Sequence, residues 1–543
     1  MNVLRYWHTL RFLKPVQIYG RIWYRLHRPK ADRRPAPPRR PAAGAWVRCA
    51  RAPSMIGADA FRFLNVERRI AGAQDWNRAD WPKLWLYNLH YFDDLNADGA
   101  QARSDWQRAL LARWIAENPP AGGNGWEPYP TSLRIANWIK WALSGNAPAG
   151  DMAHSLAVQA RWLRRRLERH LLGNHLFANA KALAFAGAFF DGPEADAWRA
   201  QGLAILQREL AEQVLPDGGH FERSPMYHAL ILEDLLDLVQ LALRWPGAVA
   251  PAQAAAWRQA AARMLHWLAA MTHPDDEIAL FNDAAFGIAP GPAALADYAA
   301  ALGVAAVSPA LTFPGATLLA DCGYARLEKG PAVLIADVGE IGPDYLPGHA
   351  HADTLSFELS LFGRRVVVNS GTSEYGLGPE RLRQRGTAAH STLQVDGADS
   401  SEVWSGFRVA RRARPQDLRL AAQDEALALS CAHDGYRRLP GRPLHRREWR
   451  LGAQALRVTD AIEGGFGEAV ARFHLHPAVA ATGEGSAGVL RLPGGQEVRW
   501  QATGGTVRAV ASTWHPAFGR SLPCTRLELV LDGPRVTMEF SWN

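Results

Sequence analysis

The spacing of apolar residues divides the chain into a helical part and a β part. From about residue 60 to about residue 305, apolar side chains recur every three or four positions, and short Gly, Pro, Asn or Asp breaks separate the segments. Successive helices without intervening strands favour antiparallel pairs in an (α/α) toroid. The predicted helices are Gln101–Glu117, Leu133–Leu143, Met152–Leu172, Phe177–Phe190, Trp198–Val214, Tyr227–Leu243 and Ala252–Met271.

The pattern changes beyond about residue 315. Short runs with alternating or β-branched apolar residues follow one another, and turn signals such as Val395-Asp396-Gly397 separate several of them. This pattern is typical of a large antiparallel β-sandwich. The predicted strands include Ala332–Ala336, Thr354–Leu361, Arg365–Asn369, Leu427–Ser430, Ala455–Val458 and Leu527–Leu531.

Three regions follow from these patterns: a basic, aromatic lead with a Pro/Arg linker at 1–50, a toroid domain at 51–312 and a β-sandwich domain at 313–543. We expect the lead to dock as a helix on the main body, with an amphipathic surface segment as the alternative. Arg11, Lys14 and Arg21 interrupt any secretory apolar region, and no run reaches the ~20 apolar residues of a membrane span. The sequence therefore predicts a cytoplasmic protein, with the periplasm as the alternative.

The composition and net charge indicate which classes of partner the protein could bind. The 543 residues carry a net charge of +8 and a pI near 9.4, which favours an acidic partner. No helix-turn-helix, RNA-binding or zinc-finger pattern indicates nucleic acid, and a polyanionic sugar fits the basic balance as well. The four cysteines are widely scattered and form no CxxC pair, which disfavours disulfides and thiolate metal sites. The oligomeric state is left open.

The candidate chemistry is concentrated in Gly348-His349-Ala350-His351-Ala352-Asp353, which opens a predicted strand. Two imidazoles and a carboxylate are costly to bury unless they bind a metal, transfer protons or hydrogen-bond one another. Zinc binding with His390 as a third ligand is one interpretation, and a hydrogen-bonded polar cluster at the domain boundary is the other.

Two helix starts add further candidates. Asn174 and His175 follow a helix break, where Asn commonly caps a helix but could also hydrogen-bond a substrate carboxylate. Tyr227 and His228 follow Ser224 and Pro225, which predict a capped first turn. The positive end of that helix would lower the pKa of the Tyr227 hydroxyl and ease proton abstraction; ordinary aromatic packing is the alternative.

Other side chains are candidates for sugar contact. Trp126 and Tyr129 belong to a Gly-rich loop, where aromatic residues near a cleft can stack on sugar rings. Arg134 and Arg385 could bind carboxylate or sulfate, although structural salt bridges explain such arginines equally well. Nothing resembles a P-loop, a dinucleotide-binding motif or a GxSxG elbow.

Three of these blocks together resemble the heparinase II/III-like polysaccharide lyase family. The blocks are Asn174-His175, the run from Ser224 to His228, and the run from His349 through Asn369-Ser370-Gly371-Thr372 to His390. The resemblance covers most of residues 80–460 and implies a helical toroid followed by an antiparallel β domain. It also implies cleavage of uronic-acid polysaccharides by β-elimination, giving 4,5-unsaturated products without a required cofactor.

The resemblance also implies roles for single residues. Asn174 and His175 would neutralise the uronate carboxylate, Tyr227 would act as base, acid or both, and His349 would act as the opposing base or contact the carboxylate. The further candidates for substrate contact come from their residue types and not from the family: Trp126, Tyr129, Arg134, His228 and Arg385.

A structural zinc is part of what the resemblance implies, since metal-containing relatives bind zinc at positions that look like His351, Asn369 and His390. This chain departs from them at Asn369, where those relatives have an aspartate, and at Ser391, where an asparagine is common. The first departure removes an anionic ligand, although two imidazoles could still hold zinc together with water or another carboxylate.

Two other functions compete with the lyase. A glycoside hydrolase would need two carboxylates flanking the bond, and a non-catalytic glycan-binding or exopolysaccharide assembly protein would keep the fold alone. The carboxylates that the sequence offers a hydrolase are Asp217, Glu222, Asp275, Asp276 and Glu277.

Overall fold

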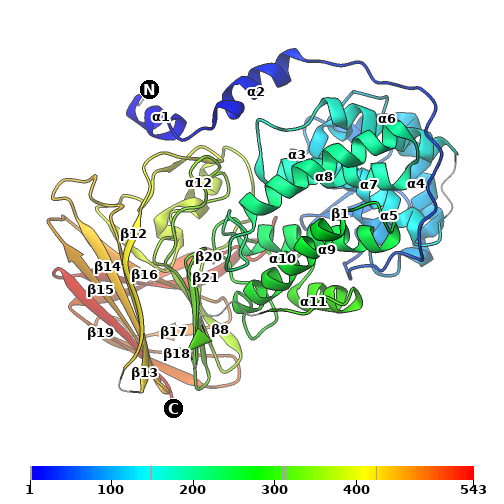
Figure 1. The fold of residues 1–543 in the computed structure, drawn as a ribbon. Coiled ribbons are helices and arrows are strands. Elements are labelled where there is room, and N and C mark those ends of the chain that lie inside the picture. The colour runs from blue at the N-terminus through cyan, green and yellow to red at the C-terminus, as the bar shows by residue number, and fades with distance from the viewer. Residues whose placement is uncertain (1–2, 147–149, 308–311, 314, 424) are drawn as a thin grey trace.

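The computed structural model describes residues 3–146, 150–307, 312–313, 315–423 and 425–543. It consists of a helical part followed by antiparallel sheets, as the hydrophobic periodicity predicts (Figure 1). The helical elements lie on one side of the molecule and the sheets on the other. The helices therefore precede the sheets along the chain, in the order that the apolar pattern predicts.

The seven predicted helices all form. They are joined by α3 (Lys83–Tyr91) and α11 (Pro292–Ala301), which the periodicity did not single out, and by the small β1–β2 hairpin (Ala60–Phe63, Val66–Arg69). Pro residues at the first turns of α5, α8, α9, α10 and α11 fix where these helices begin. The predicted helices correspond to α4 (Ser104–Glu117), α5 (Pro128–Leu143), α6 (Gly150–Arg165), α7 (Gly173–Phe189), α8 (Pro193–Gln213), α9 (Pro225–Arg244) and α10 (Pro251–Ala270).

Helix α7 lies at the centre of the helical part. Almost every one of its residues is buried, which agrees with a sequence that is apolar on all sides of the helix. It packs most extensively on α8 and α5, and it also contacts α6 and α9. The buried core of this part is rich in tryptophan, because Trp76, Trp114, Trp138 and Trp198 are all fully enclosed.

Two antiparallel sheets face each other across a second core, which confirms the predicted sandwich. Apolar residues from both sheets, such as Leu334 and Trp449, meet in this core. One sheet contains β20 (Gly505–Trp514), β21 (Leu522–Leu531), β16 (Ala469–Leu475), β8 (Arg364–Val368), β7 (Phe357–Leu361), β6 (Ala332–Asp337), β5 (Tyr324–Lys329), β4 (Ala316–Leu319) and β3 (Thr312–Phe313), with β9 (Leu393–Val395) paired to β16. The other contains β12 (Pro415–Gln423), β13 (Ala426–His433), β14 (Leu444–Leu451), β15 (Ala455–Glu463), β22 (Arg535–Ser541), β19 (Glu497–Thr503), β18 (Ala487–Arg491) and β17 (Ala480–Thr482).

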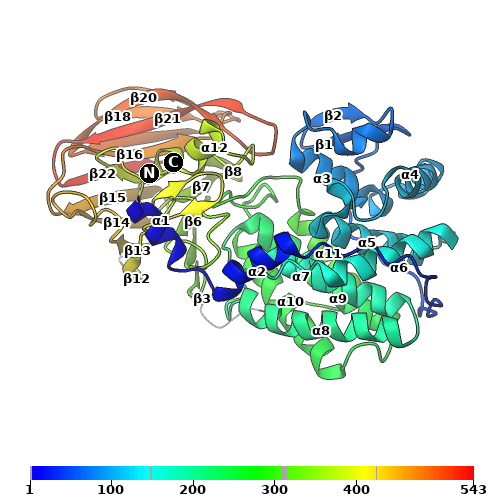
Figure 2. The ribbon, with the colours of Figure 1, turned by 90° about the horizontal axis from the view of Figure 1, so that it is seen from above.

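The N-terminal lead forms α1 (Val3–Leu10) and α2 (Pro15–Leu26), followed by an extended linker. Both helices lie on the outer surface, and together they run from the β part to the helical part (Figure 2). Between the sheets and the helices, α12 (Pro379–Arg385) and the β10–β11 hairpin (Val403–Trp404, Arg408–Val409) cover the upper end of the β part. Among the described residues, no helix is long and apolar enough to cross a membrane.

Candidate active site

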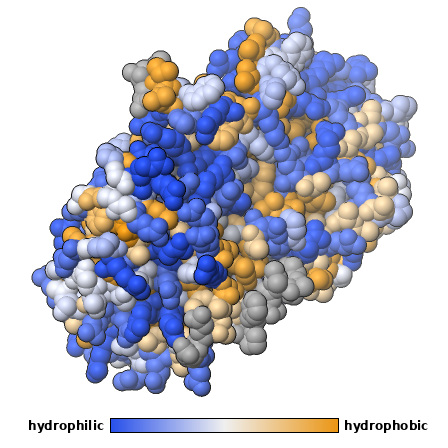
Figure 3. All heavy atoms as spheres, turned by 60° about the vertical axis from the view of Figure 1, so that its left-hand side comes forward, coloured by the Kyte–Doolittle hydropathy of each residue, from blue (hydrophilic) through white to orange (hydrophobic). Residues whose placement is uncertain are grey.

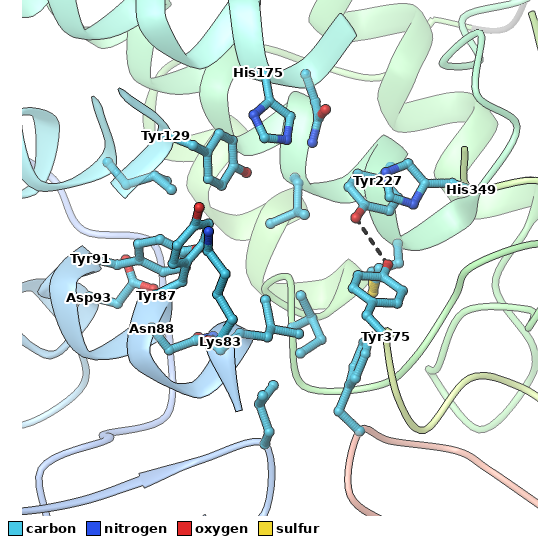
Figure 4. A pocket seen from close by; sticks show the side chains of 18 of the residues that line it. Lys83, Tyr87, Asn88, Tyr91, Asp93, Tyr129, His175, Tyr227, His349 and Tyr375 are labelled. Atoms are coloured by element: carbon cyan, nitrogen blue, oxygen red, sulfur yellow. Dashed lines mark hydrogen bonds between the residues drawn. The ribbon is translucent and has the colours of Figure 1, made fainter. Parts of the chain in front are cut away.

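A cavity of about 900 Å³ lies where the helical part meets the β part. Helices α3, α5, α7 and α9 supply one wall, and loops of the β part that contain Gly348, His349 and Tyr375 supply the other. Figure 4 shows Tyr227, His349 and Tyr375 together on one side of the cavity, facing Tyr87, Tyr91 and Tyr129. A cavity of this size, lined by aromatic and polar side chains, is suited to sugar units.

Tyr227 enters the cavity from the first turn of α9. Ser224 caps this helix by accepting a hydrogen bond from the Tyr227 N–H, as the sequence predicts. The Tyr227 and Tyr375 hydroxyls lie 3.0 Å apart. Burial, followed by the neighbouring Tyr375 and Asp283, raises the pKa of Tyr227 well above its ordinary value. The expectation that the helix end would lower this pKa is therefore wrong, because removing the hydroxyl from water outweighs the helix dipole.

Asp283 holds the two histidines of the His-x-His motif. One of its carboxylate oxygens lies 2.9 Å from His349 Nδ1 and the other lies 2.8 Å from His351 Nε2. The Arg381 guanidinium donates to both oxygens, and its Nη2 lies 2.7 Å from Oδ2 of Asp283. Burial opposes ionisation of Asp283, yet Arg381 and the two histidines hold its pKa well below the usual range. The interpretation of the motif as a hydrogen-bonded cluster at the domain boundary thus describes its main contacts.

This arrangement fixes the tautomer of His349. An ionised Asp283 can only accept, so Nδ1 of His349 carries the proton and Nε2 is left as an acceptor. The His349 ring lies against the Tyr227 ring, with 3.9 Å between centroids. An imidazole held by a carboxylate with its second nitrogen unprotonated has the arrangement of a general base.

Asn174 and His175 lie in the first turn of α7 and line the cavity. They follow a tight turn in which Gly173 has a φ of +54°, and a Cβ there would lie 2.4 Å from a Leu346 methyl group. His175 Nδ1 lies 3.2 Å from Glu168. Burial works against the charged imidazole, but Glu168 and then Glu222 hold the pKa of His175 above its ordinary value. The pair therefore presents an amide and an imidazole that favours protonation.

Glu222 is buried at 2% exposure and lines the same cavity. Neither of its oxygens has a hydrogen-bonding side-chain partner in the described part of the chain, and His349 Nε2 lies 3.7 Å from one of them. Burial raises the pKa of this carboxyl. A buried acceptor without a partner is costly, so Glu222 is available to a hydroxyl or amine of a bound sugar.

Acidic side chains outnumber basic ones along the cavity. Six carboxylates line it, against four cations. Each cation is already paired: Arg51 with Glu233 at 2.6 Å, Lys83 with Glu127 at 2.9 Å, Lys140 with Asp237 at 2.9 Å and Lys181 with Asp234 at 2.6 Å. The carboxylates are Asp93, Glu222, Glu233, Asp234, Asp237 and Glu374. The positive charge of the whole chain is therefore not repeated inside the cavity.

The structure brings together the predicted catalytic residues Asn174, His175, Tyr227 and His349. The sugar-contact candidate Tyr129 joins them, with 4.5 Å between its ring centroid and that of His175. It keeps the other four candidates for substrate contact away from the cavity, which corrects their prediction. Trp126, Arg134, His228 and Arg385 are buried, and each hydrogen-bonds to backbone carbonyls: Asn118, His90, Met264 and Ala350, respectively. These are structural contacts, since each polar group replaces a contact with water.

The residues that the resemblance assigns to zinc do lie close together. The rings of His351 and His390 have centroids 5.2 Å apart, and Asn369 accepts a hydrogen bond from the Ser391 N–H. Free nitrogens remain on both histidines. The set nevertheless does not fit zinc, because two imidazoles and a neutral amide provide no anionic ligand, and the amide oxygen is already used. No group of three His, Cys, Asp or Glu residues able to hold a metal occurs among the described residues. The unpartnered nitrogens fit a buried water better.

The sequence did not identify Asp283 or Tyr375, and it named Glu222 only for a hydrolase. Asp283 follows Asn282 in the connection between α10 and α11, and Tyr375 lies in a loop of the β part. A polar pair within the otherwise apolar run from Ile278 to Ala285 was the available signal for Asp283. Nothing comparable marks Tyr375, because a single tyrosine in a polar loop is common.

Family models match both parts of the chain. The heparinase II/III N-terminus model matches residues 103–290, and the heparinase II/III-like C-terminal model matches residues 314–543. The chain belongs to the heparinase II/III-like family. Membership confirms the resemblance carried by the three motif blocks and accounts for the order of the helical and β parts.

Curated relatives of this chain include a protein named for its localisation and proteins named as lyases. FtsZ-localized protein C of Caulobacter vibrioides is 28% identical over 443 residues, which cover 74% of this chain and 71% of that protein. The heparin-sulfate lyase of Pedobacter heparinus is 25% identical over 306 residues, which cover 50% of this chain and 44% of the lyase.

Solved structures of the family show the same fold. Heparinase III aligns with a TM-score of 0.66 at 17% identity, covering 88% of this chain and 79% of that one. A mutant of the heparan sulfate lyase HepC from Pedobacter heparinus aligns with a TM-score of 0.60 at 18% identity, covering 89% and 81%. The architecture is thus that of a polysaccharide lyase.

Proposed function

We propose that the protein is a polysaccharide lyase that cleaves a uronic-acid polysaccharide by β-elimination to give 4,5-unsaturated uronate ends. The observation that carries this proposal is the convergence of Tyr227, His349 and the Asn174–His175 pair on one cavity. Family membership supports it independently. The bound polymer would be glycosaminoglycan-like or a bacterial exopolysaccharide.

The contacts assign a separate task to each group. Asn174 and a protonated His175 would bind the uronate carboxylate and stabilise the negative charge that develops on it when the C5 proton leaves. His349 Nε2, free to accept because Nδ1 donates to Asp283, would take that proton. Tyr227, protonated because its pKa is raised, would donate to the departing glycosidic oxygen. Electrons from the broken C5–H bond form the C4–C5 double bond, and those of the C4–O bond leave with the oxygen.

The position of the acid relative to the base restricts the substrate. Tyr227 and His349 come from the helical wall and the β wall, respectively, but they meet on one side of the cavity, with 3.9 Å between their ring centroids (Figure 4). Proton removal and donation would then occur on one face of the sugar. This suits a uronate whose C5–H and C4–O bonds lie on the same face, as in the gluco configuration.

The first test is ultraviolet absorbance during incubation with heparosan, N-sulfated heparosan and heparan sulfate. A rising band from the conjugated uronate would establish β-elimination, and a flat trace with every uronate polymer would refute the proposed reaction. We expect heparosan to be cleaved, and its N-sulfated form to have a kcat/KM at least about tenfold lower. The reason is that every cation lining the cavity is already paired with a carboxylate. Equal or faster cleavage of the sulfated polymer would contradict the charge argument while leaving the reaction intact.

A second prediction concerns pH. The raised pKa of His175 means that its imidazolium persists above the ordinary value and is lost as the pH rises through the raised value. Carboxylate neutralisation, and with it kcat/KM, should therefore decline on the alkaline side. Glu168→Gln should move this decline to lower pH by about one unit, because the neighbouring negative charge is gone. Glu222 and Glu127 also favour the imidazolium and remain in the variant.

The control for this variant is Glu209→Gln, which changes another buried carboxyl, on α8, that is not among the charges acting on His175. It should leave the pH profile of kcat/KM unchanged. A Glu168→Gln enzyme with the parent profile would show that His175 does not act as the imidazolium.

A non-catalytic role in assembly is the second candidate. It is favoured by the match to FtsZ-localized protein C, which is named for its location. Glycan binding without any ultraviolet signal would support it. Of the carboxylates that the sequence offered to a hydrolase, only Glu222 lines the cavity.

A further inference from the structure

Helices α1 and α2 expose a continuous set of large apolar side chains. In α1 these residues follow helical spacing on one side, and α2 repeats the pattern. More than half of the surface of each side chain is exposed, up to 75% for Leu26. Figure 3 shows hydrophobic residues standing out from the upper edge of the molecule, where Figure 1 places these helices. The set, called the apolar stripe below, is Val3, Leu4, Trp7, Leu10, Ile18, Tyr19, Ile22, Trp23 and Leu26.

The stripe is exposed although both helices contact the body of the protein. Tyr6 of α1 packs edge-on against Trp404, at 4.9 Å between ring centroids, and Trp404 Nε1 donates to Thr9. Gln17 of α2 is buried and donates to the Tyr345 carbonyl, and Tyr24 lies 4.4 Å from the His170 ring. Each helix thus uses one side to hold the body of the protein and presents the other. The predicted docking and the alternative of an amphipathic surface segment are both met.

The charged side chains of the segment that carries the stripe are all basic. The first acidic residue of the chain is Asp32, so the segment from residue 3 to residue 31 contains no carboxylate side chain. Exposed lysines and arginines flank the stripe at positions such as Arg21, Arg25 and Arg28. The Lys and Arg residues of the segment are Arg5, Arg11, Lys14, Arg21, Arg25, Arg28 and Lys30. A strongly amphipathic helix with a basic polar face and with Trp and Tyr among its apolar residues is typical of a segment that lies in a membrane interface.

A small pocket beside α2, lined in part by Tyr19 and Trp23 of the stripe, adds a second feature. It has a volume of about 250 Å³ and lies between α2 and the C-terminal end of α6. Arg164, Arg165, Arg166 and Arg169 line it, and no carboxylate does. None of the four forms an ion pair within the described part of the chain, and the partners of the first three are the Gln201 amide and the backbone carbonyls of Lys30, Tyr24 and His27. Such a pocket suits a phosphate group, which arginine binds well.

We infer that α1, α2 and the arginine pocket bind the surface of an anionic phospholipid membrane, with the apolar stripe in the acyl boundary and a headgroup phosphate at the arginines. Neither the family nor the proposed lyase activity requires this. An acidic polysaccharide would neutralise the arginines but would leave the stripe in water. A bilayer satisfies both, because its anionic headgroups lie directly above its hydrocarbon.

The test is flotation of the full chain with vesicles of phosphatidylcholine mixed with phosphatidylglycerol, and with vesicles of phosphatidylcholine alone. We expect binding to the anionic vesicles, weakened by salt as the Debye length falls from about 10 Å at 0.1 M towards ~3 Å at 1 M. Trp23→Glu should weaken binding at least about tenfold, because an indole is replaced by a charge at the bilayer boundary. Arg169→Gln should weaken it about fivefold.

Two matched controls test whether the loss of vesicle binding is specific to the stripe and the arginine pocket. Trp106→Glu changes another exposed tryptophan, on α4, and Arg69→Gln changes an exposed arginine on β2. Both should bind vesicles like the parent, and thermal unfolding should show that Trp23→Glu folds. Failure of the parent to bind anionic vesicles, or equal binding by Trp23→Glu, would overturn the inference. Soluble polyglutamate that binds as tightly, with the same loss in Trp23→Glu, would replace the membrane by an acidic protein.

Discussion

Tyr227→Phe is expected to lower kcat for the β-elimination about 10²- to 10⁴-fold while leaving the Kd for the polysaccharide nearly unchanged. The substitution removes only the hydroxyl that would protonate the glycosidic oxygen, and general acid catalysis contributes a factor of this size. The ring stays against His349, so the shape of the cavity is kept. Initial rates by ultraviolet absorbance and binding by calorimetry give the two quantities separately.

Tyr375→Phe is the control, because it removes the neighbouring hydroxyl that hydrogen-bonds to Tyr227 at 3.0 Å. It should cost at most about tenfold in kcat, since a single hydrogen bond contributes roughly 1 kcal/mol. Losses of equal size in the two variants would show that the tyrosine pair acts as a unit. A Tyr227→Phe enzyme with normal kcat would refute the acid assignment.

Asp283→Asn is expected to destabilise the protein by about 3–5 kcal/mol, the cost of removing one partner of a buried ion pair. Asp283 and Arg381 are both fully buried, and the amide leaves the guanidinium without its counter-charge. The variant should also lose at least about 10² in kcat/KM, because the amide no longer fixes the protonation of His349. Urea unfolding and the ultraviolet assay under conditions where the variant is folded measure the two effects.

Asp275→Asn provides the comparison for stability. Asp275 is also an Arg-paired aspartate, but its side chain is 36% exposed, and its partner Arg365 keeps a second carboxylate, Glu358. We expect a change of at most about 1 kcal/mol. Similar destabilisation in both variants would mean that burial of the Asp283–Arg381 pair carries no special cost. Full activity of folded Asp283→Asn would contradict its role in positioning His349.

The helices were predictable because their signal is local. Segments such as α9 and α10 repeat apolar residues every three or four positions and begin at a proline, so neighbouring residues alone define them. Helix α3 was not predicted, because it is short and its aromatic residues are distributed around the helix. The strands of the sandwich followed from alternation, but their order in the two sheets did not, since pairing joins segments far apart in the chain.

The active-site residues were predictable only where they belong to a motif. Asn174, Tyr227 and His349 stand in sequence blocks, whereas Trp126, Arg134, His228 and Arg385 were chosen for their chemistry and prove to be buried structural groups. A residue type shows what a side chain can bind, but not whether it faces a cavity or a carbonyl. For the same reason the net charge of +8 pointed to a basic binding site, while the cavity is lined mainly by carboxylates.

The sequence by itself determined the two-part architecture, the family and the group of four catalytic candidates, because these depend on periodicity and on short motifs. Only the tertiary structure decided that Asp283 holds His349 and His351, that Tyr375 lies beside Tyr227, and that the apolar side of α1 and α2 faces outward. These facts depend on contacts between residues up to 148 positions apart and on which side of a helix is covered. Helical spacing fixes the two sides of a helix, but only packing against the rest of the chain selects the side that is buried.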